Sequence, residues 1–115
     1  MRRHPVAPPQ TNSLRYIDKL RMQMAKVAWK FLIRGEVQGV GYRFFAQRAA
    51  ARHQVLGHVR NCPDGSVEVV AEGFPGAVEE FKKALVAGPQ WSRVEQVEEI
   101  NLEPTGLYAS FRIER

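Results

Sequence analysis

The stretch KVAWKFLIRGEVQGVGYRFFAQRAA, residues 26–50, contains the pattern that decides the fold. Residues 26–34 alternate with a period of two and carry apolar groups on both faces, which predicts a central β-strand. Three glycines within residues 35–41 then interrupt any regular element. An apolar stripe with helical spacing follows in residues 43–55 and predicts a helix. The residues of that stripe are Phe45, Ala46, Ala49 and Ala50.

The rest of the chain continues with strands and one further helix. The turn signal Pro63-Asp64-Gly65 is typical of a β-hairpin, because proline presets φ and glycine accepts a positive φ. Val94 and Val97 are three residues apart, so we expect their strand to contain a bulge. The expected elements are strands at 58–61 and 67–72, a helix from Pro75 to the stop at Gly88, and strands at 94–102 and 109–113.

This order of elements predicts an α+β protein of one domain. A β-α-β-β-α-β chain with a terminal strand is typical of the ferredoxin-like α/β sandwich. We therefore expect a mostly antiparallel sheet with both helices on one face. The domain is expected to span residues 25–115, which is enough chain for a single core. Residues 1–24 are expected to be a disordered or weakly structured basic extension. The alternatives for that segment are a transit peptide and a functional basic arm.

Charge and composition disfavour several classes of function. The net charge is +5, but residues 1–24 carry five Lys and Arg against one Asp, so the domain itself is nearly neutral. A nucleic-acid-binding surface needs basic residues clustered on the folded body, so we expect no nucleic-acid partner. No apolar run is long enough for a membrane span. The single cysteine, Cys62, cannot form a disulfide within the chain, which predicts a reducing, cytoplasmic setting. We also expect a monomer.

The glycine-bearing segment 35–43 has the parts of an anion site. A loop between a strand and a helix N-terminus can direct several backbone N–H groups inward, and the helix dipole adds positive potential. Arg43 stands at the start of the helix, where its guanidinium can bind phosphate oxygens in pairs. The segment lacks the Gly-Lys-Ser/Thr ending of a magnesium-nucleotide loop. An ordinary loop with a surface arginine remains the alternative interpretation.

Asn61, at the end of an expected strand, is the second candidate. Its amide could orient a water molecule, although asparagine also favours such a turn for local reasons. Cys62 follows directly, but no histidine is placed by sequence to activate it. His53 is expected to be a packed or solvated histidine. No residues have the spacing of a metal site, so we expect neither metal nor cofactor.

Together the two segments resemble the acylphosphatase family over residues 26–115. The family pattern G-x-V-Q-G-V-x-x-R is met by Gly35, Val37, Gln38, Gly39, Val40 and Arg43. A second pattern, N-x-x-x-G-x-V followed by a glycine, is met by Asn61, Gly65, Val67 and Gly73. The resemblance implies the same ferredoxin-like fold. It also implies a metal-independent hydrolase that cleaves acyl phosphates to a carboxylate and inorganic phosphate.

The resemblance also implies roles for individual residues. Arg43 and Asn61 would be catalytic, with Arg43 on the phosphoryl group and Asn61 positioning the attacking water. The resemblance implies that the phosphate-binding residues are Glu36, Val37, Gln38, Gly39, Val40, Gly41, Tyr42 and Arg43. Two positions depart from the family: His58 replaces a usual aromatic residue, and Tyr42 a usual Phe or Met. Both are expected to pack beside the site.

Two rival interpretations use the same fold. An RNA-recognition module would need exposed aromatic residues and a basic face on its sheet, and the nearly neutral domain disfavours it. The second rival is a domain that has the fold but catalyses no reaction, like the acylphosphatase-like unit of larger carbamoyl-transfer enzymes. Hydrolysis of benzoyl phosphate in the presence of EDTA would separate the enzyme from both.

Overall fold

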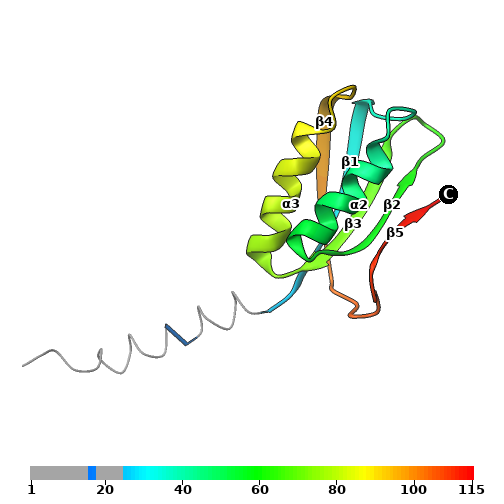
Figure 1. Ribbon diagram of the computed structural model, residues 1–115. Helices are drawn as coiled ribbons and strands as arrows, with labels where there is room; N and C mark the ends of the chain where they lie inside the picture. Colours follow the sequence, from blue (N-terminus) through cyan, green and yellow to red (C-terminus); the bar gives the residue numbers. More distant parts are fainter. Residues whose placement is uncertain (1–15, 18–24) are drawn as a thin grey trace, which may run out of the picture.

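The computed structural model describes residues 16–17 and 25–115 (Figure 1). The expected extension therefore lies outside the described residues, apart from residues 16–17. Seven elements follow in the predicted order, which confirms the α+β assignment. They are β1 (Val27–Glu36), α2 (Tyr42–His53), β2 (Leu56–Asn61), β3 (Val67–Gly73), α3 (Pro75–Ala87), β4 (Arg93–Leu102) and β5 (Phe111–Glu114).

The strands form one five-stranded sheet in the order β4-β1-β3-β2-β5. β1 pairs antiparallel with β3 and β4, and β2 pairs antiparallel with β3. β5 pairs with β2 in parallel at the edge. Both helices cover the same face of the sheet (Figure 1). The ferredoxin-like prediction of a mostly antiparallel sheet with its helices on one side is confirmed.

The bulge expected in β4 is present. Arg34 pairs with Gln96, whereas the next residue, Gly35, pairs with Val94, so one residue of β4 is left without a partner. This extra residue explains the irregular spacing of the sequence, because Val94 and Val97 both pack against the core. The last strand begins later than its alternation predicted. Ala109 is exposed and lies in a bend before β5, because only residues from Phe111 onward pair with β2.

The core lies between the sheet and the two helices. Phe31 and Ile33 of β1 are almost fully buried, and each buried side chain of this size stabilises the fold by about 2 to 3 kcal/mol. α2 contributes small residues, which let its backbone approach the sheet closely. The helix residues that are buried in this core are Tyr42, Ala46, Ala49, Ala50, Val78, Phe81 and Leu85.

Candidate active site

The loop between β1 and α2 has a conformation that its glycines make possible. Gly39 has φ = 75° and Gly41 has φ = 78°, both in the left-handed region. A Cβ atom at either position would meet nothing within 4 Å, so the backbone conformation and not crowding favours glycine there. Gly41 is also the N-cap of α2. The loop therefore turns tightly into the helix.

In the part of the chain that the structure describes, several backbone N–H groups of this segment have no partner. Among the described residues, no acceptor is found for the N–H groups of residues 38–44, whereas the Phe45 N–H donates to the Gly41 carbonyl at 3.0 Å. The first N–H groups of any α-helix lack a partner within the helix. These groups and the positive end of the helix dipole make the segment able to bind an anion.

Arg43 is the second residue of α2, and its guanidinium lies against β5. Its Nη1 atom donates to the backbone carbonyl of Glu114, with 3.4 Å between nitrogen and oxygen. One turn later, the Gln47 amide donates to the Phe111 carbonyl at 3.2 Å. Two side chains of α2 therefore bind the backbone of the edge strand. The half-buried Arg43 side chain is held at the N-terminal end of the helix.

Asn61 is the last residue of β2 and lies across the same pocket. In the described part of the chain, no hydrogen bond is found for its side-chain amide. A pocket of about 160 Å³ is lined by Val37, Gly39, Gly41, Tyr42, Arg43, Phe44 and Asn61. The structure thus brings Arg43 and Asn61 together with part of the glycine-bearing loop, although they are 18 residues apart in the sequence.

Three of the residues expected to bind phosphate do not line this pocket. Glu36 is an exposed residue that ends β1 and pairs with Arg93. The Gln38 side chain donates to backbone carbonyls of the β2–β3 turn instead. Val40 packs against the hydrophobic core. Conversely, Phe44 lines the pocket without having been singled out from the sequence.

Tyr42 turns inward at the start of α2. Its ring is 2% exposed, and its hydroxyl group donates to the Leu85 carbonyl of α3 at 2.6 Å. Burial raises the pKa of Tyr42 well above its ordinary value, so the phenol stays protonated. Tyr42 therefore packs beside the pocket, as expected, and joins the two helices.

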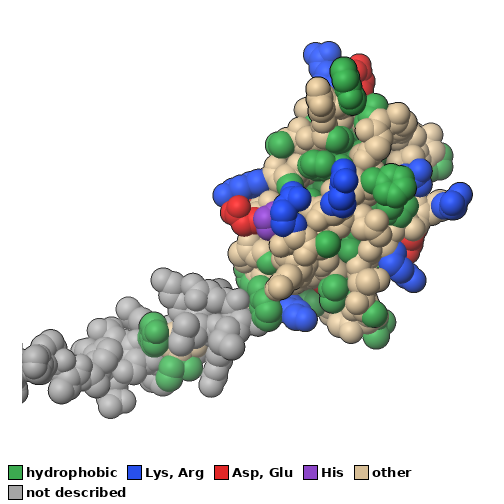
Figure 2. All heavy atoms as spheres, in the orientation of Figure 1, with side chains coloured by type: hydrophobic (Ala, Val, Ile, Leu, Met, Phe, Trp, Pro, Cys, Tyr) green, Lys and Arg blue, Asp and Glu red, His purple; other side chains and the backbone are tan. Residues whose placement is uncertain are grey.

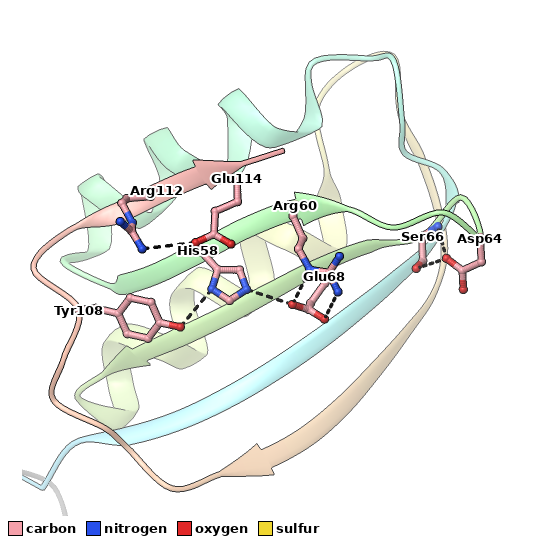
Figure 3. A network of polar contacts seen from close by, with 8 residues as sticks. All are labelled: His58, Arg60, Asp64, Ser66, Glu68, Tyr108, Arg112 and Glu114. Atoms are coloured by element: carbon pink, nitrogen blue, oxygen red, sulfur yellow. Dashed lines mark hydrogen bonds and ion pairs between the residues drawn. The ribbon is translucent and has the colours of Figure 1, made fainter.

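His58 does not pack beside the pocket, contrary to the prediction. Side chains alternate along a strand, and Val59 faces the core, so His58 faces the opposite side of the sheet from Asn61. There its Nε2 atom lies 3.0 Å from a Glu68 carboxylate oxygen and its Nδ1 atom 3.1 Å from the Tyr108 hydroxyl group (Figure 3).

Glu68 is the centre of this network on the open face. Arg60 donates to both carboxylate oxygens of Glu68, at 3.1 and 3.2 Å (Figure 3). Burial alone would raise the pKa of Glu68, but the hydrogen bonds from Arg60 and His58 outweigh it, so the pKa lies below its usual value. The network therefore joins β2 and β3 and remains apart from the pocket around Asn61.

The β2–β3 turn next to Asn61 is held by Asp64. The hydroxyl group of Ser66 and its backbone N–H donate to Asp64 and, with Arg34, lower the pKa of that carboxyl to about 2. Cys62 in this turn is half-buried and free.

Within the described residues, no group of three or more His, Cys, Asp or Glu side chains could hold a metal ion. No helix of residues 16–17 and 25–115 has the length and apolar character that crossing a membrane requires.

A larger pocket of about 770 Å³ lies around the C-terminal half of α2, and it shares no lining residue with the smaller one. Its lining is mostly apolar, and the unpartnered N–H groups of the loop are absent from it. The smaller pocket therefore combines loop residues with unpartnered N–H groups and the Arg43 side chain, a combination that the larger pocket lacks. On the helix-bearing face, Lys and Arg side chains are spread among hydrophobic and polar ones (Figure 2).

Comparison with known proteins gives one consistent result. The model of the acylphosphatase family matches residues 29–113. An acylphosphatase of Solibacter usitatus is 49% identical over 86 residues, which are 75% of this chain and 88% of the relative. The crystal structure of acylphosphatase from Bacillus subtilis superposes with a TM-score of 0.75 at 31% identity, covering 77% of this chain and 99% of that one. Full-length HypF, in its phosphate- and nucleotide-bound form, matches with a TM-score of 0.73 at 26% identity, over 79% of this chain and 12% of that one.

Proposed function

The chain belongs to the acylphosphatase family, and from this membership we propose how it acts on its substrate. As an acylphosphatase it is a hydrolase of acyl phosphates, which yields a carboxylate and inorganic phosphate. We propose that the reaction takes place in the pocket lined by Arg43 and Asn61. The observation that carries this proposal is the meeting of one guanidinium, one free amide and the loop N–H groups around a single small pocket.

The proposed role of Arg43 and the loop is to bind the phosphoryl group. The unpartnered N–H groups of the pocket-lining residues in the loop and the first turn of α2 would donate to phosphoryl oxygens, and the guanidinium would neutralise charge on them. Donors that already point at the site before the substrate arrives need no rearrangement as charge develops, so they stabilise the transition state efficiently. Phosphoryl transfer asks mainly for such positioning and charge stabilisation.

The proposed role of Asn61 is to orient the attacking water molecule. An amide can donate and accept hydrogen bonds but is too weak a base to take a proton. We propose that the water proton passes to a phosphoryl oxygen of the substrate. The bond between water oxygen and phosphorus forms while the bond to the acyl oxygen breaks, and its electron pair leaves with the carboxylate. Because a carboxylate is a stable anion near neutral pH, no general acid is required.

The test compares Arg43→Ala and Asn61→Ala with the unchanged protein on benzoyl phosphate. Each substitution is expected to lower kcat by about 100-fold or more, in line with the loss of a preorganised donor. Arg52→Ala on the exposed side of α2 and Asn101→Ala in β4 are the matched controls and should keep full activity. Circular dichroism would verify that all four variants fold. Full activity of the Arg43 or the Asn61 variant would refute its assigned role.

The remaining parts of the proposal concern conditions and chain organisation. We propose that residues 25–115 form the active domain and that it works as a cytoplasmic monomer, without metal or cofactor. Hydrolysis should therefore persist in EDTA, and size-exclusion chromatography should give the mass of one 13.1 kDa chain. Activity that needs an added divalent cation would contradict the metal-independent mechanism.

A further inference from the structure

The pocket around Arg43 is too small to enclose a whole acyl phosphate with a large acyl group. Its volume is about 160 Å³, whereas pockets that bury drug-sized ligands measure roughly 300 to 1,000 Å³. Its lining residues include Gly39 and Gly41, whose N–H groups suit a phosphoryl group, and Arg43, whose guanidinium does too. A substrate bound by its phosphoryl group must therefore extend its acyl part across the rim.

Phe44 is the large apolar side chain at this rim. It is 66% exposed, and of the exposed large hydrophobic residues in the described part of the chain it alone lines this pocket. Successive residues of an α-helix point about 100° apart. Tyr42, two positions earlier, enters the core, so Phe44 points away from the core toward solvent.

The other rim positions offer no comparable surface. Gly39 and Gly41 have no side chains, while Arg43 and Asn61 are polar. Phe44 belongs neither to the buried core cluster nor to the half-buried residues that pack against it. Its apolar ring is therefore free to be covered by a ligand, and covering it would remove apolar surface from water.

We infer that Phe44 is a specificity-determining residue that contacts the acyl group of the substrate and favours aromatic over short aliphatic acyl groups. The inference rests on the proposed function. An aromatic acyl group can stack on the exposed ring in an offset or edge-to-face arrangement, which adds to the effect of area alone. An acetyl group is too small to cover the ring, so it gains little from the same contact.

The experiment measures kcat/KM for benzoyl phosphate and for acetyl phosphate and compares their ratio among variants. Phe44→Ala is expected to lower the ratio of benzoyl to acetyl phosphate by about 3- to 10-fold, the size of an aromatic pair contact. Phe44→Tyr keeps the aromatic face and should keep the ratio. Phe74→Ala removes another exposed phenylalanine, at the start of α3, and should leave the ratio unchanged. Competitive inhibition by inorganic phosphate should be the same in all variants.

The outcomes separate this inference from the proposed function. A ratio that is unchanged in Phe44→Ala, or an equal loss on both substrates, overturns the inference while the hydrolase assignment stands. A ratio that falls as much in Phe74→Ala also overturns it, because the effect would not belong to the pocket rim. If the unchanged protein hydrolyses neither substrate, the proposed function fails and the inference fails with it.

Discussion

The side-chain nitrogen of Gln38 lies 2.9 Å from the backbone carbonyl oxygen of Cys62 and donates a hydrogen bond to it. The same nitrogen donates to the Ser66 carbonyl at 2.8 Å. These two bonds fasten the loop after β1 to the turn that follows Asn61. The two sides of the pocket, one with the loop N–H groups and the other with Asn61, are therefore joined by one side chain.

Gln38→Ala should loosen this connection. It removes two half-buried hydrogen bonds, so we expect the free energy of unfolding to fall by about 1 to 3 kcal/mol. The loop N–H groups would lose their fixed position, and kcat/KM for benzoyl phosphate should fall by about 10-fold. Urea unfolding and steady-state kinetics measure the two effects.

Gln38→Glu provides the sharper control. A carboxylate has the size of the amide but can only accept hydrogen bonds, so it would face two carbonyl oxygens with no donor. We therefore expect the Glu variant to be less stable than the Ala variant at neutral pH. A Glu variant as stable as the unchanged protein would show that the amide donors contribute nothing.

Acid stability should depend on Glu72, which is 5% exposed and holds the loop before β5. Thr105 donates to its carboxylate through the backbone N–H and the hydroxyl group, both at 2.9 Å, and the Gly106 N–H donates at 3.1 Å. Burial would raise the pKa of Glu72, but these three donors outweigh it and lower the pKa from its ordinary 4.5. The folded state therefore binds this proton less readily than the unfolded state.

The ionised Glu72 carboxylate therefore stabilises the fold above pH 4.5, the ordinary pKa of the group. This stabilisation is lost as the pH falls through the lowered pKa of the folded state. Between pH 4.5 and lower pH, the free energy of unfolding should fall less steeply in Glu72→Gln than in the unchanged protein. The two slopes should differ by at most about 1.4 kcal/mol per pH unit, the effect of one proton. Thr105→Val removes the hydroxyl donor to Glu72, together with the acceptor of the Leu107 N–H, and should give an intermediate slope. Urea titrations from pH 6 to pH 3 measure the free energy of unfolding at each pH. Parallel curves for all three proteins would contradict the role of Glu72 in acid stability.

His58→Phe should leave catalysis almost unchanged, because His58 faces the side of the sheet away from Asn61. The substitution keeps an aromatic ring at this position and removes the contacts to Glu68 and Tyr108. Arg60 still binds Glu68 through two hydrogen bonds, so we expect the network to persist in part. The value of kcat/KM should stay within about twofold, as expected for a residue outside the pocket. A tenfold change would show that the open face communicates with the pocket.

The fold could be predicted from the sequence because its signals are local. Alternation marked β1, three glycines marked the loop, and the irregular spacing of Val94 and Val97 marked the bulge in β4. The parallel pairing of β5 with β2 had no such signal, since strand direction at an edge depends on how a long connection crosses the sheet. The choice of Arg43 and Asn61 came mainly from the family resemblance, and their catalytic roles remain predictions.

The site was harder to predict where a side chain finds its partner far along the chain. Gln38 and Cys62 are 24 residues apart, and no periodicity connects them. Two signals were nevertheless available in the sequence. Because side chains alternate along a strand, His58 and Val59 must face opposite sides of the sheet. The apolar stripe of α2 begins at Phe45, so Phe44 lies outside it.

Tyr42→Phe tests how α2 is anchored, since it removes the hydroxyl group and keeps the ring. The hydroxyl group of Tyr42 donates to the Leu85 carbonyl at 2.6 Å inside the core, where water cannot replace it. Removing the donor leaves a buried carbonyl of α3 without this bond, so we expect a loss of about 1 to 3 kcal/mol in the free energy of unfolding. The ring keeps its packing, and kcat should change little because the loop N–H groups keep their geometry. Thermal and urea unfolding measure the loss, and a large fall in kcat without a loss of stability would assign the hydroxyl group a role in the pocket instead.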